Sequence, residues 1–313
     1  MKANKRKQNN DWQNPIATNL LQKYDYEKDI LEIIELESEN LLANLSIETS
    51  SLFEGGIFTP VEGILSYLYN AKTFNSKQTA FAGTIKNTPD HLEITTSGQH
   101  YFRRRFSLAH ELGHLVLRQL VSPLTFQEMR QEQFFHQEEE TLCNLFASSI
   151  LIPRNQVNNY LIKGDSITTQ LVNRIAKDFR VNREVVLRRI ACLTNSILLL
   201  WNDVSNPRTK ESKKTERIIR VFPNSSLLSD YYIPLFCTAG KSRFSPNIIL
   251  ESFLKGDSIS GYVKVENLGS LPNGKYKIHN LFFQRWSNTL LLNRIVEQPK
   301  NFYNMATLIE LNQ

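Results

Sequence analysis

Residues 105–114 read Arg105-Phe106-Ser107-Leu108-Ala109-His110-Glu111-Leu112-Gly113-His114, and the last five of them form an H-E-x-x-H motif. Apolar residues recur through and beyond this stretch at helical spacing, which predicts an amphipathic helix from residue 105 to 120 that ends before Pro123. Residues four apart share one face of a helix, so both imidazoles of the motif can point at a single ion.

The motif carries the chemistry of a metal-dependent hydrolase. Zinc takes imidazole nitrogen at about 2.0–2.1 Å within a small tetrahedral cage, which His110 and His114 can begin to form. Glu111 lies one position further round the helix, where it can take a proton from the attacking water and hand it to the leaving amine. The alternative is a pair of helix-surface histidines beside a chance glutamate, and the amphipathic context weighs against it.

A catalytic zinc needs a third protein ligand and one open position. A second helix, predicted from residue 131 to 151, supplies four candidates: His136, Glu138, Glu139 and Glu140. Glu140 is the best of them, because Asn144 shares its helical face and can hydrogen-bond a ligand histidine. Glu138 and Glu139 are expected on a solvated acidic face, while His136, one turn before Glu140, stays the alternative third ligand.

Two short strands precede the motif. Residues 81–85 and 91–95 have a strand-like period, with a turn at 87–90 between them. An edge hairpin of this kind can accept an extended peptide by strand addition, which makes Phe81, Gly83 and Ile85 candidates for substrate binding. Candidates for an oxyanion-stabilising donor lie just before the motif: His100, Tyr101, Arg103, Arg104 and Arg105. Alternatively, these are surface residues near a helix start.

The N-terminal part of the chain is predicted to be helical after a tail. Residues 1–15 are expected to form a disordered basic tail. Apolar spacing predicts one helix over residues 24–45, and a second over residues 59–69 with Pro60 in its first turn.

Two shorter helices are predicted at 168–179 and 183–192, in the outline of a helix-turn-helix. The basic residues of this segment are Arg174, Lys177, Arg180, Arg183, Arg188 and Arg189. Such a segment can enter a groove of DNA. Short helix pairs more often pack against the rest of a protein or recognise its substrate, and that interpretation is favoured.

After residue 195 the sequence takes on β character. Short apolar runs alternate with turn residues, at 197–201, 217–222, 231–237, 261–265, 275–283 and 289–295. They predict a separate β-rich domain over residues 196–313, without a catalytic constellation. His279 and Cys237 stand alone in it and are expected to be ordinary core or surface residues.

Composition sets outer limits on function. The chain has 313 residues, 41% hydrophobic and 22% charged, which fits a soluble globular protein of about two domains. No apolar run approaches the ~20 residues of a membrane span, and none follows the basic N-terminus as in a secretory signal. Three scattered cysteines favour the cytoplasm over an oxidising compartment. The net charge of +6 permits contact with nucleic acid without demanding it.

Two blocks of the sequence resemble one known family. Residues 105–114 look like the R-F-T-x-A-H-E-L-G-H block of the ImmA/IrrE metallo-endopeptidases. Residues 140–153, ETLCNLFASSILIP, are similar to that family's second block, E-x-x-A-N-x-F-A-x-x-L-L-M-P. The likeness covers roughly residues 60 to 195, including a helical element at 175–184. Ser107, Cys143 and Ile152 depart from the pattern without removing a group that the mechanism needs.

We therefore expect an α+β protein. A helical metallopeptidase core with a small β-sheet edge would occupy residues 16–160, a helix-turn-helix-like segment residues 161–195, and the β-rich domain residues 196–313. By the resemblance, His110, His114 and Glu140 bind one zinc ion, with manganese as the alternative metal, and Glu111 is the general base.

The resemblance also implies a target and a partner. The family's usual substrates are helix-turn-helix repressors of the Xre type, whose cleavage relieves repression of stress, phage or mobile-element genes. By analogy with a related radiation-response protease, residues 196–313 sense a signal or select the substrate. Two other interpretations stay open: a DNA-binding regulator or antitoxin partner with a structural peptidase fold, and a general aminopeptidase or housekeeping protease.

Overall fold

The computed structural model describes residues 12–53, 57–76, 83–97, 100–121, 133–161, 166–194, 196–204, 215–222, 259–265, 271–282 and 305–311. The chain falls into two compact units. The helical unit comprises residues 7–162 and 174–189, and the sheet unit comprises residues 1–6, 163–173 and 190–313. Helices combine with one mixed and one antiparallel sheet, so the protein is α+β, as the sequence predicts.

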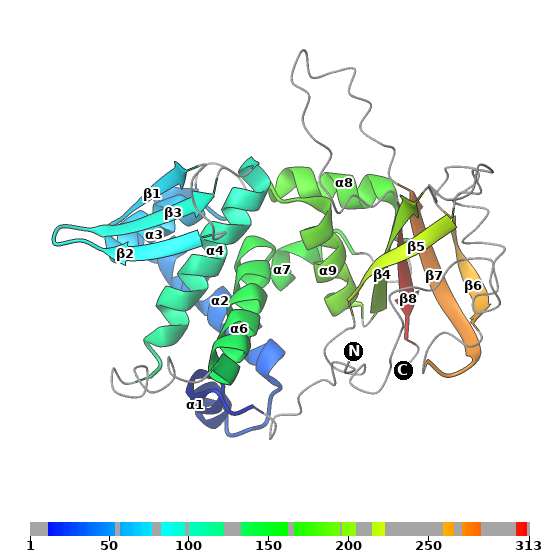
Figure 1. The fold of residues 1–313 in the computed structure, drawn as a ribbon, viewed down its shortest axis with the longest axis horizontal. Coiled ribbons are helices and arrows are strands. Elements are labelled where there is room, and N and C mark those ends of the chain that lie inside the picture. Colours follow the sequence, from blue (N-terminus) through cyan, green and yellow to red (C-terminus); the bar gives the residue numbers. More distant parts are fainter. Residues whose placement is uncertain are drawn as a thin grey trace, which may run out of the picture. The chain divides into compact units, whose positions relative to one another are not determined.

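Packed helices build the helical unit. They are α1 (Pro15–Lys23), α2 (Ile30–Glu48), the 3-10 helix η2 (Ser50–Phe53), α3 (Val61–Tyr69), α4 (Tyr101–Arg118), α6 (Gln133–Leu151) and α7 (Arg154–Val157). Polar side chains cap the first two: Asn14 accepts a hydrogen bond from the Ile16 amide, and Asp29 accepts from the first amides of α2. α6 packs against both α4 and α2 (Figure 1). No helix among the described residues is long and apolar enough to cross a membrane.

A three-stranded sheet packs on α4. Its strands are β1 (Ala71–Ser76), β2 (Gly83–Asn87) and β3 (Leu92–Ser97), in the order β1-β3-β2. β1 runs parallel to β3, and β2 runs antiparallel to it, with Ile85 opposite Ile94. α4 contacts β2 and β3, while α3 contacts β1 (Figure 1). β2 therefore lies at an edge of the described sheet, next to the helix that carries the H-E-x-x-H motif.

The core of the helical unit lies between α2, α4 and α6. Its fully buried apolar side chains include Ile33, Ile34, Leu45, Leu108, Leu112, Phe146 and Ile150. Each such side chain contributes about 1.5–3 kcal/mol through burial. This packing holds α4 and α6 in a fixed register, so the side chains at their interface have defined positions.

The predicted helix-turn-helix segment forms α8 (Thr169–Asp178) and α9 (Arg183–Leu193). Arg180, in the turn, has a φ of 52°, and its guanidinium lies 3.7 Å from the centre of the Phe58 ring. Arg189 of α9 is buried, where it bonds to Glu35 of α2 at 2.6 Å and donates to the carbonyl oxygen of Ile152 at 2.9 Å. These two basic residues are therefore engaged within the helical unit.

The sheet unit contains β4 (Ser196–Val204), β5 (Thr215–Phe222), β6 (Ile259–Val265), β7 (Gly274–Phe282) and β8 (Met305–Glu310). Their order is β5-β4-β8-β7-β6, and every neighbouring pair is antiparallel. Buried aliphatic residues line the strands, among them Ile197, Leu199, Ile278 and Leu308. His279 of β7 is fully buried, and its two ring nitrogens lie 2.9 Å from Ser260 Oγ and 2.7 Å from Glu310 Oε1.

The structure changes several predicted boundaries. The helix expected over residues 24–45 is wrong in its first part, because α2 begins at Ile30 after a turn with positive φ at Asp25 and Tyr26. Trp12 and Asn14, which were expected in a tail, are buried. β1 and β8 are strands that the sequence pattern does not predict. The runs at 231–237 and 289–295, with Cys237, lie outside the described residues, as does Phe81.

Candidate metal centre

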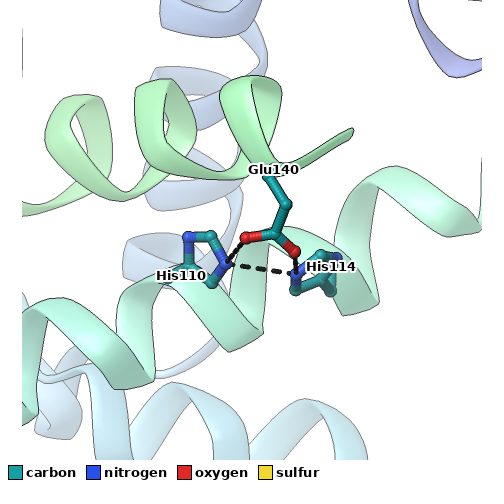
Figure 2. A group of neighbouring side chains, drawn as sticks. All are labelled: His110, His114 and Glu140. Carbon is teal, nitrogen blue, oxygen red and sulfur yellow. Dashed lines mark hydrogen bonds and ion pairs between the residues drawn. The ribbon is translucent and has the colours of Figure 1, made fainter. Parts of the chain in front are cut away.

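Three side chains from two helices converge on one point. His110 and His114 project from α4, and Glu140 projects from α6 toward them (Figure 2). The Nε2 atoms of the histidines are 3.2 Å apart, and each lies 3.2 Å from a different carboxylate oxygen of Glu140. The ligand atoms of these three residues all lie within 4.8 Å of one another.

The spacing of these atoms suits a tetrahedral metal ion. Ligands bound at about 2.0–2.1 Å around a tetrahedral centre are separated by roughly 3.3–3.4 Å, close to the 3.2 Å between the atoms of this group. Two imidazoles and one carboxylate also leave a fourth position for water or substrate. The chemistry and the geometry of the three side chains therefore fit a zinc ion.

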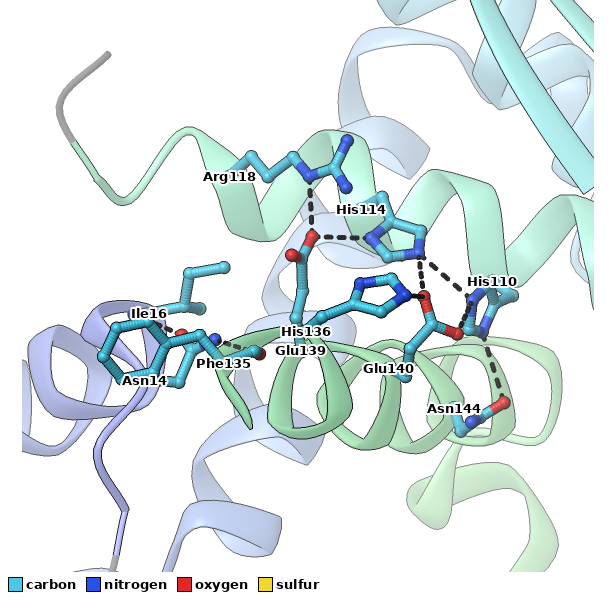
Figure 3. A network of polar contacts seen from close by, with 10 residues as sticks. All are labelled: Asn14, Ile16, His110, His114, Arg118, Phe135, His136, Glu139, Glu140 and Asn144. Carbon is cyan, nitrogen blue, oxygen red and sulfur yellow. Dashed lines mark hydrogen bonds and ion pairs between the residues drawn. The ribbon is translucent and has the colours of Figure 1, made fainter. Parts of the chain in front are cut away.

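The other ring nitrogen of each histidine has its own acceptor. His114 Nδ1 lies 2.7 Å from Oε1 of Glu139, and His110 Nδ1 lies 3.2 Å from Oδ1 of Asn144 (Figure 3). An ionised carboxylate and an amide oxygen can only accept, so each Nδ1 carries the proton and each Nε2 presents a lone pair. Two lone pairs and the carboxylate of Glu140 then face one another, an arrangement that a cation stabilises.

The electrostatics of the group favour positive charge. Burial opposes charge on His114, but hydrogen bonds with Cys143, Glu139 and Glu140 outweigh it and raise the pKa of the imidazole to about 11. When the rings also carry a proton on Nε2, hydrogen bonds from His110 and His114 hold the pKa of Glu140 well below its usual range. The site thus attracts a cation, which can be a proton or a metal ion.

Close packing of the two helices brings Glu140 within reach of the histidines. At Gly113 of α4, a Cβ atom would lie 3.2 Å from Cα of Cys143 and 3.3 Å from Cδ1 of Phe146. A larger residue there would press α6 away from α4. The glycine inside the H-E-x-x-H motif therefore permits the helix separation that the site requires.

Glu111 lies beside the group rather than in it. The residue is 8% exposed, and burial raises the pKa of its carboxyl, although His114 and His110 oppose that rise. Gly83 of the edge strand β2 packs directly on Glu111, because a Cβ atom at this glycine would lie 2.9 Å from Glu111 Cδ. The strand predicted to bind substrate and the predicted general base are therefore neighbours.

The prediction for Glu138 and Glu139 is wrong, because both carboxylates are buried rather than solvated. Glu138 accepts hydrogen bonds from two backbone amides that precede α1, at 2.7 and 3.1 Å. Glu139 Oε1 accepts from His114 and, at 2.6 Å, from Nε of Arg118 (Figure 3). Three consecutive glutamates of α6 thus face three different partners.

Sequence reasoning misses the pair formed by Glu139 and Arg118. Arg118 lies four residues after His114, and this helical spacing could have placed it on the same face of α4. Only the packing of α6 against α4 brings the Glu139 carboxylate between the two side chains.

Other predicted residues surround the group without joining it. His136 is largely exposed, and its Nε2 lies 3.9 Å from Glu140 Oε1, outside the converging set. Arg105, a candidate oxyanion donor, is buried and donates instead to the carbonyl oxygen of Thr59 at 2.9 Å. α4 begins at Tyr101, earlier than predicted, with His100 as its N-cap residue. Ile85 is half-buried on β2.

Residues 91–191 match the family model of a peptidase family that is described as the IrrE N-terminal-like domain. This part of the chain is an IrrE N-terminal-like domain. The IrrE N-terminal-like domain runs from β3 through both helices of the site to α9, so it contains all three converging side chains. The match confirms the family predicted from the two sequence blocks.

Solved structures share the fold. A Mycobacterium tuberculosis transcriptional regulator matches over 93% of this chain and 77% of its own length, with 11% identity and a TM-score of 0.50. At this identity the likeness concerns the fold alone. None of the curated proteins compared with the chain matches it.

Proposed function

We propose that this protein is a zinc-dependent endopeptidase in which His110, His114 and Glu140 hold the metal. The observation that carries the proposal is the convergence of two imidazoles and one carboxylate. The two Nε2 atoms are 3.2 Å apart, each lies 3.2 Å from one oxygen of Glu140, and Glu111 is buried beside them. The peptidase family of the IrrE N-terminal-like domain supports it. Manganese is the alternative metal, but two imidazoles and a carboxylate suit zinc well.

The roles of the side chains follow from their positions. A zinc ion held by the three residues would supply a Lewis acid that polarises the scissile carbonyl and acidifies a water. Glu111 acts as the general base: its carboxylate takes a proton from the attacking water and then transfers it to the leaving amine. Burial raises the pKa of this carboxyl, which suits a group that must hold a proton between two steps. Asn144 keeps the His110 ring oriented.

The substrate is expected to lie along β2. This strand forms an edge of the described sheet, so its backbone groups can pair with an extended peptide. Because Gly83 packs on Glu111, a peptide added there passes close to the general base. We assign substrate binding to Gly83 and Ile85, and Phe81 precedes them in the same sequence run.

The target that we propose is a helix-turn-helix repressor of the Xre type, on the strength of the family resemblance. Its cleavage would relieve repression in a stress, phage or mobile-element response. Recognition through an edge strand fits a protein substrate, because strand pairing reads the backbone of an extended chain.

The main alternative is a regulator that binds DNA and uses the peptidase fold as a scaffold. Engaged cations in the α8–α9 segment weigh against it: Arg189 is bonded to Glu35, Arg180 lies on a phenyl ring, and Arg188 pairs with Glu184 at 2.8 Å. Arg189 in particular is buried, so it cannot reach the phosphates of DNA. A purely structural role for the peptidase fold would also not require three converging metal-ligand side chains and a buried general base.

Glu111→Gln provides the test, because it keeps the shape of the residue and removes the base. Cells that make the wild-type chain are compared with cells that make the variant, and new protein N-termini are identified by mass spectrometry. We expect new termini in one or a few helix-turn-helix proteins, in the wild-type sample only. The same termini in both samples would overturn the proposal. Salt-sensitive DNA binding that survives Glu111→Gln, without cleavage, would support the regulator instead.

A further inference from the structure

The two histidines of the candidate metal centre are held by unlike partners. His110 Nδ1 lies 3.2 Å from the neutral amide oxygen of Asn144, which is an exposed residue. His114 Nδ1 lies 2.7 Å from the carboxylate of Glu139, and both of these residues are buried, at 5% and 4% exposure. The shorter, charged and buried contact belongs to the stronger class of hydrogen bond.

Arg118 stabilises the buried carboxylate of Glu139. Its Nε donates to the same Oε1 atom of Glu139 at 2.6 Å, one turn beyond His114 on α4 (Figure 3). A carboxylate buried without a positive partner is strongly unfavourable, whereas one that accepts two charge-assisted hydrogen bonds is not. The pair therefore forms a fixed negative acceptor behind the imidazole.

This acceptor has two consequences for the imidazole. It keeps the proton on Nδ1, so that Nε2 is the nitrogen that faces His110 and Glu140. It also stops rotation of the ring, because turning it would break the bond to Glu139. A carboxylate partner of this kind makes a ligand histidine more basic toward its metal.

We propose that Glu139, supported by Arg118, is a positioning residue that sets the metal affinity of the site through His114. The inference rests on the proposed metal site and goes beyond it, because the sequence blocks that suggest the site give Glu139 no role. Its effect should be seen in metal binding itself, before any cleavage is measured.

Glu138 offers a matched control on the same helix. It is buried to the same extent as Glu139, at 4% exposure, and it is also a hydrogen-bonded carboxylate. It accepts hydrogen bonds from backbone amides next to α1 rather than from a histidine. Glu138→Gln therefore removes a buried charge from α6 without changing the acceptor of His114.

The test measures zinc affinity by competition with a chromophoric chelator, in the full chain and in its Glu139→Gln and Glu138→Gln variants. We expect Glu139→Gln to weaken zinc binding by about 10- to 100-fold, the range typical for partners of ligand histidines, and Glu138→Gln to change it by less than about threefold. The visible absorption bands of the cobalt-substituted protein should shift in Glu139→Gln alone, because they report the ligand geometry. Thermal unfolding of each chelator-treated protein shows whether the variants fold.

Three outcomes separate the inference from the proposed function. Wild type that binds no zinc would overturn both. Wild type and Glu139→Gln that bind zinc equally would overturn the positioning role alone, as would an equal loss in Glu138→Gln. If Glu139→Gln does not fold, Glu139→Asp decides, because it keeps the charge but shortens the reach to His114. A loss of at least about threefold is then expected, and unchanged affinity would overturn the inference.

Discussion

Each unit of the protein contains a buried histidine that is hydrogen-bonded to a glutamate. In the helical unit, His114 Nδ1 lies 2.7 Å from Glu139 Oε1, and in the sheet unit, His279 Nε2 lies 2.7 Å from Glu310 Oε1. The two histidines are 5% and 0% exposed. Burial and a carboxylate partner therefore do not distinguish the two positions.

His114 and His279 differ in what surrounds the second nitrogen of the ring. His114 Nε2 faces His110 and Glu140, each at 3.2 Å. His279 Nδ1 lies 2.9 Å from Ser260 Oγ, so both of its nitrogens are occupied within the sheet. Among the residues that the structure describes, His279 joins no group of three converging ligand side chains.

The secondary structure explains why the outcomes differ. On α4, the residue four positions before His114 is another histidine, which helical geometry places beside it. On β7, the residues on the same face as His279 are two positions away, namely Lys277 and Leu281, and neither is a metal ligand. A buried histidine–glutamate pair becomes a candidate metal site only where a neighbouring element supplies the remaining ligands.

The largest expected effect is the loss of zinc affinity on replacing His114, with the same replacement of His279 as the comparison. His114→Asn should weaken zinc binding by more than about 100-fold, beyond the loss expected for a residue that only holds a ligand. His279→Asn should leave zinc affinity unchanged and lower the free energy of unfolding by about 1–3 kcal/mol, because buried partners lose a hydrogen bond. Chelator competition and chemical denaturation measure the two quantities. Equal zinc affinity in wild type and His114→Asn would contradict the claim that His114, unlike His279, is a zinc ligand.

A smaller effect is expected from a matched pair of glycines, one in each unit. A methyl group at Gly83 would press on the Glu111 carboxylate, whereas a methyl group at Gly261 of β6 would meet nothing within 4 Å. Gly83→Ala should retain zinc and lower the cleavage rate by up to about 100-fold, because displacing a catalytic group by about 1 Å has that effect. Gly261→Ala should cleave at the wild-type rate. If both variants cleave equally well, β2 does not constrain the base as we describe.

The smallest effect concerns pH and the sheet unit. Burial lowers the pKa of His279, although the hydrogen bond with Glu310 opposes this, and Lys277 and Ser260 also face the ring. The unfolded chain therefore binds a proton more readily than the folded one, so stability is full above the ordinary histidine pKa of about 6.5 and falls as the pH drops below it.

The difference between wild type and His279→Asn isolates this contribution. Denaturant unfolding at about pH 7.5 and about pH 5.5 should show a steeper loss of stability in wild type than in the variant. Parallel losses in the two proteins would mean that His279 does not contribute to the acid sensitivity.

Local periodicity accounts for what the sequence predicts well. The histidine pair, the helix that carries it, and the shared face of Glu140 and Asn144 all follow from helical spacing. Within the described residues, β4, β5, β6 and β7 of the sheet unit lie where apolar runs predict strands, whereas β8 does not. These features depend on residues that are close in the sequence.

The features that sequence reasoning misses depend on distant partners. The run Glu138, Glu139 and Glu140 looks like a solvated acidic face, but the sequence does not say that α1 meets the first carboxylate and α4 the second. β1, which reads AKTFNS, carries few apolar residues and forms by pairing in parallel with β3. Parallel pairing leaves little local signal, because its partner lies far along the chain.

The most direct test of the metal site is elemental analysis of purified protein after zinc loading and dialysis. Wild type is compared with Glu140→Ala and with His136→Ala, which changes the nearby histidine that the structure places outside the converging group. We predict about one zinc per chain in wild type and in His136→Ala, and no retained zinc in Glu140→Ala. No zinc in wild type, or zinc retained by Glu140→Ala and lost from His136→Ala, would contradict the site described here.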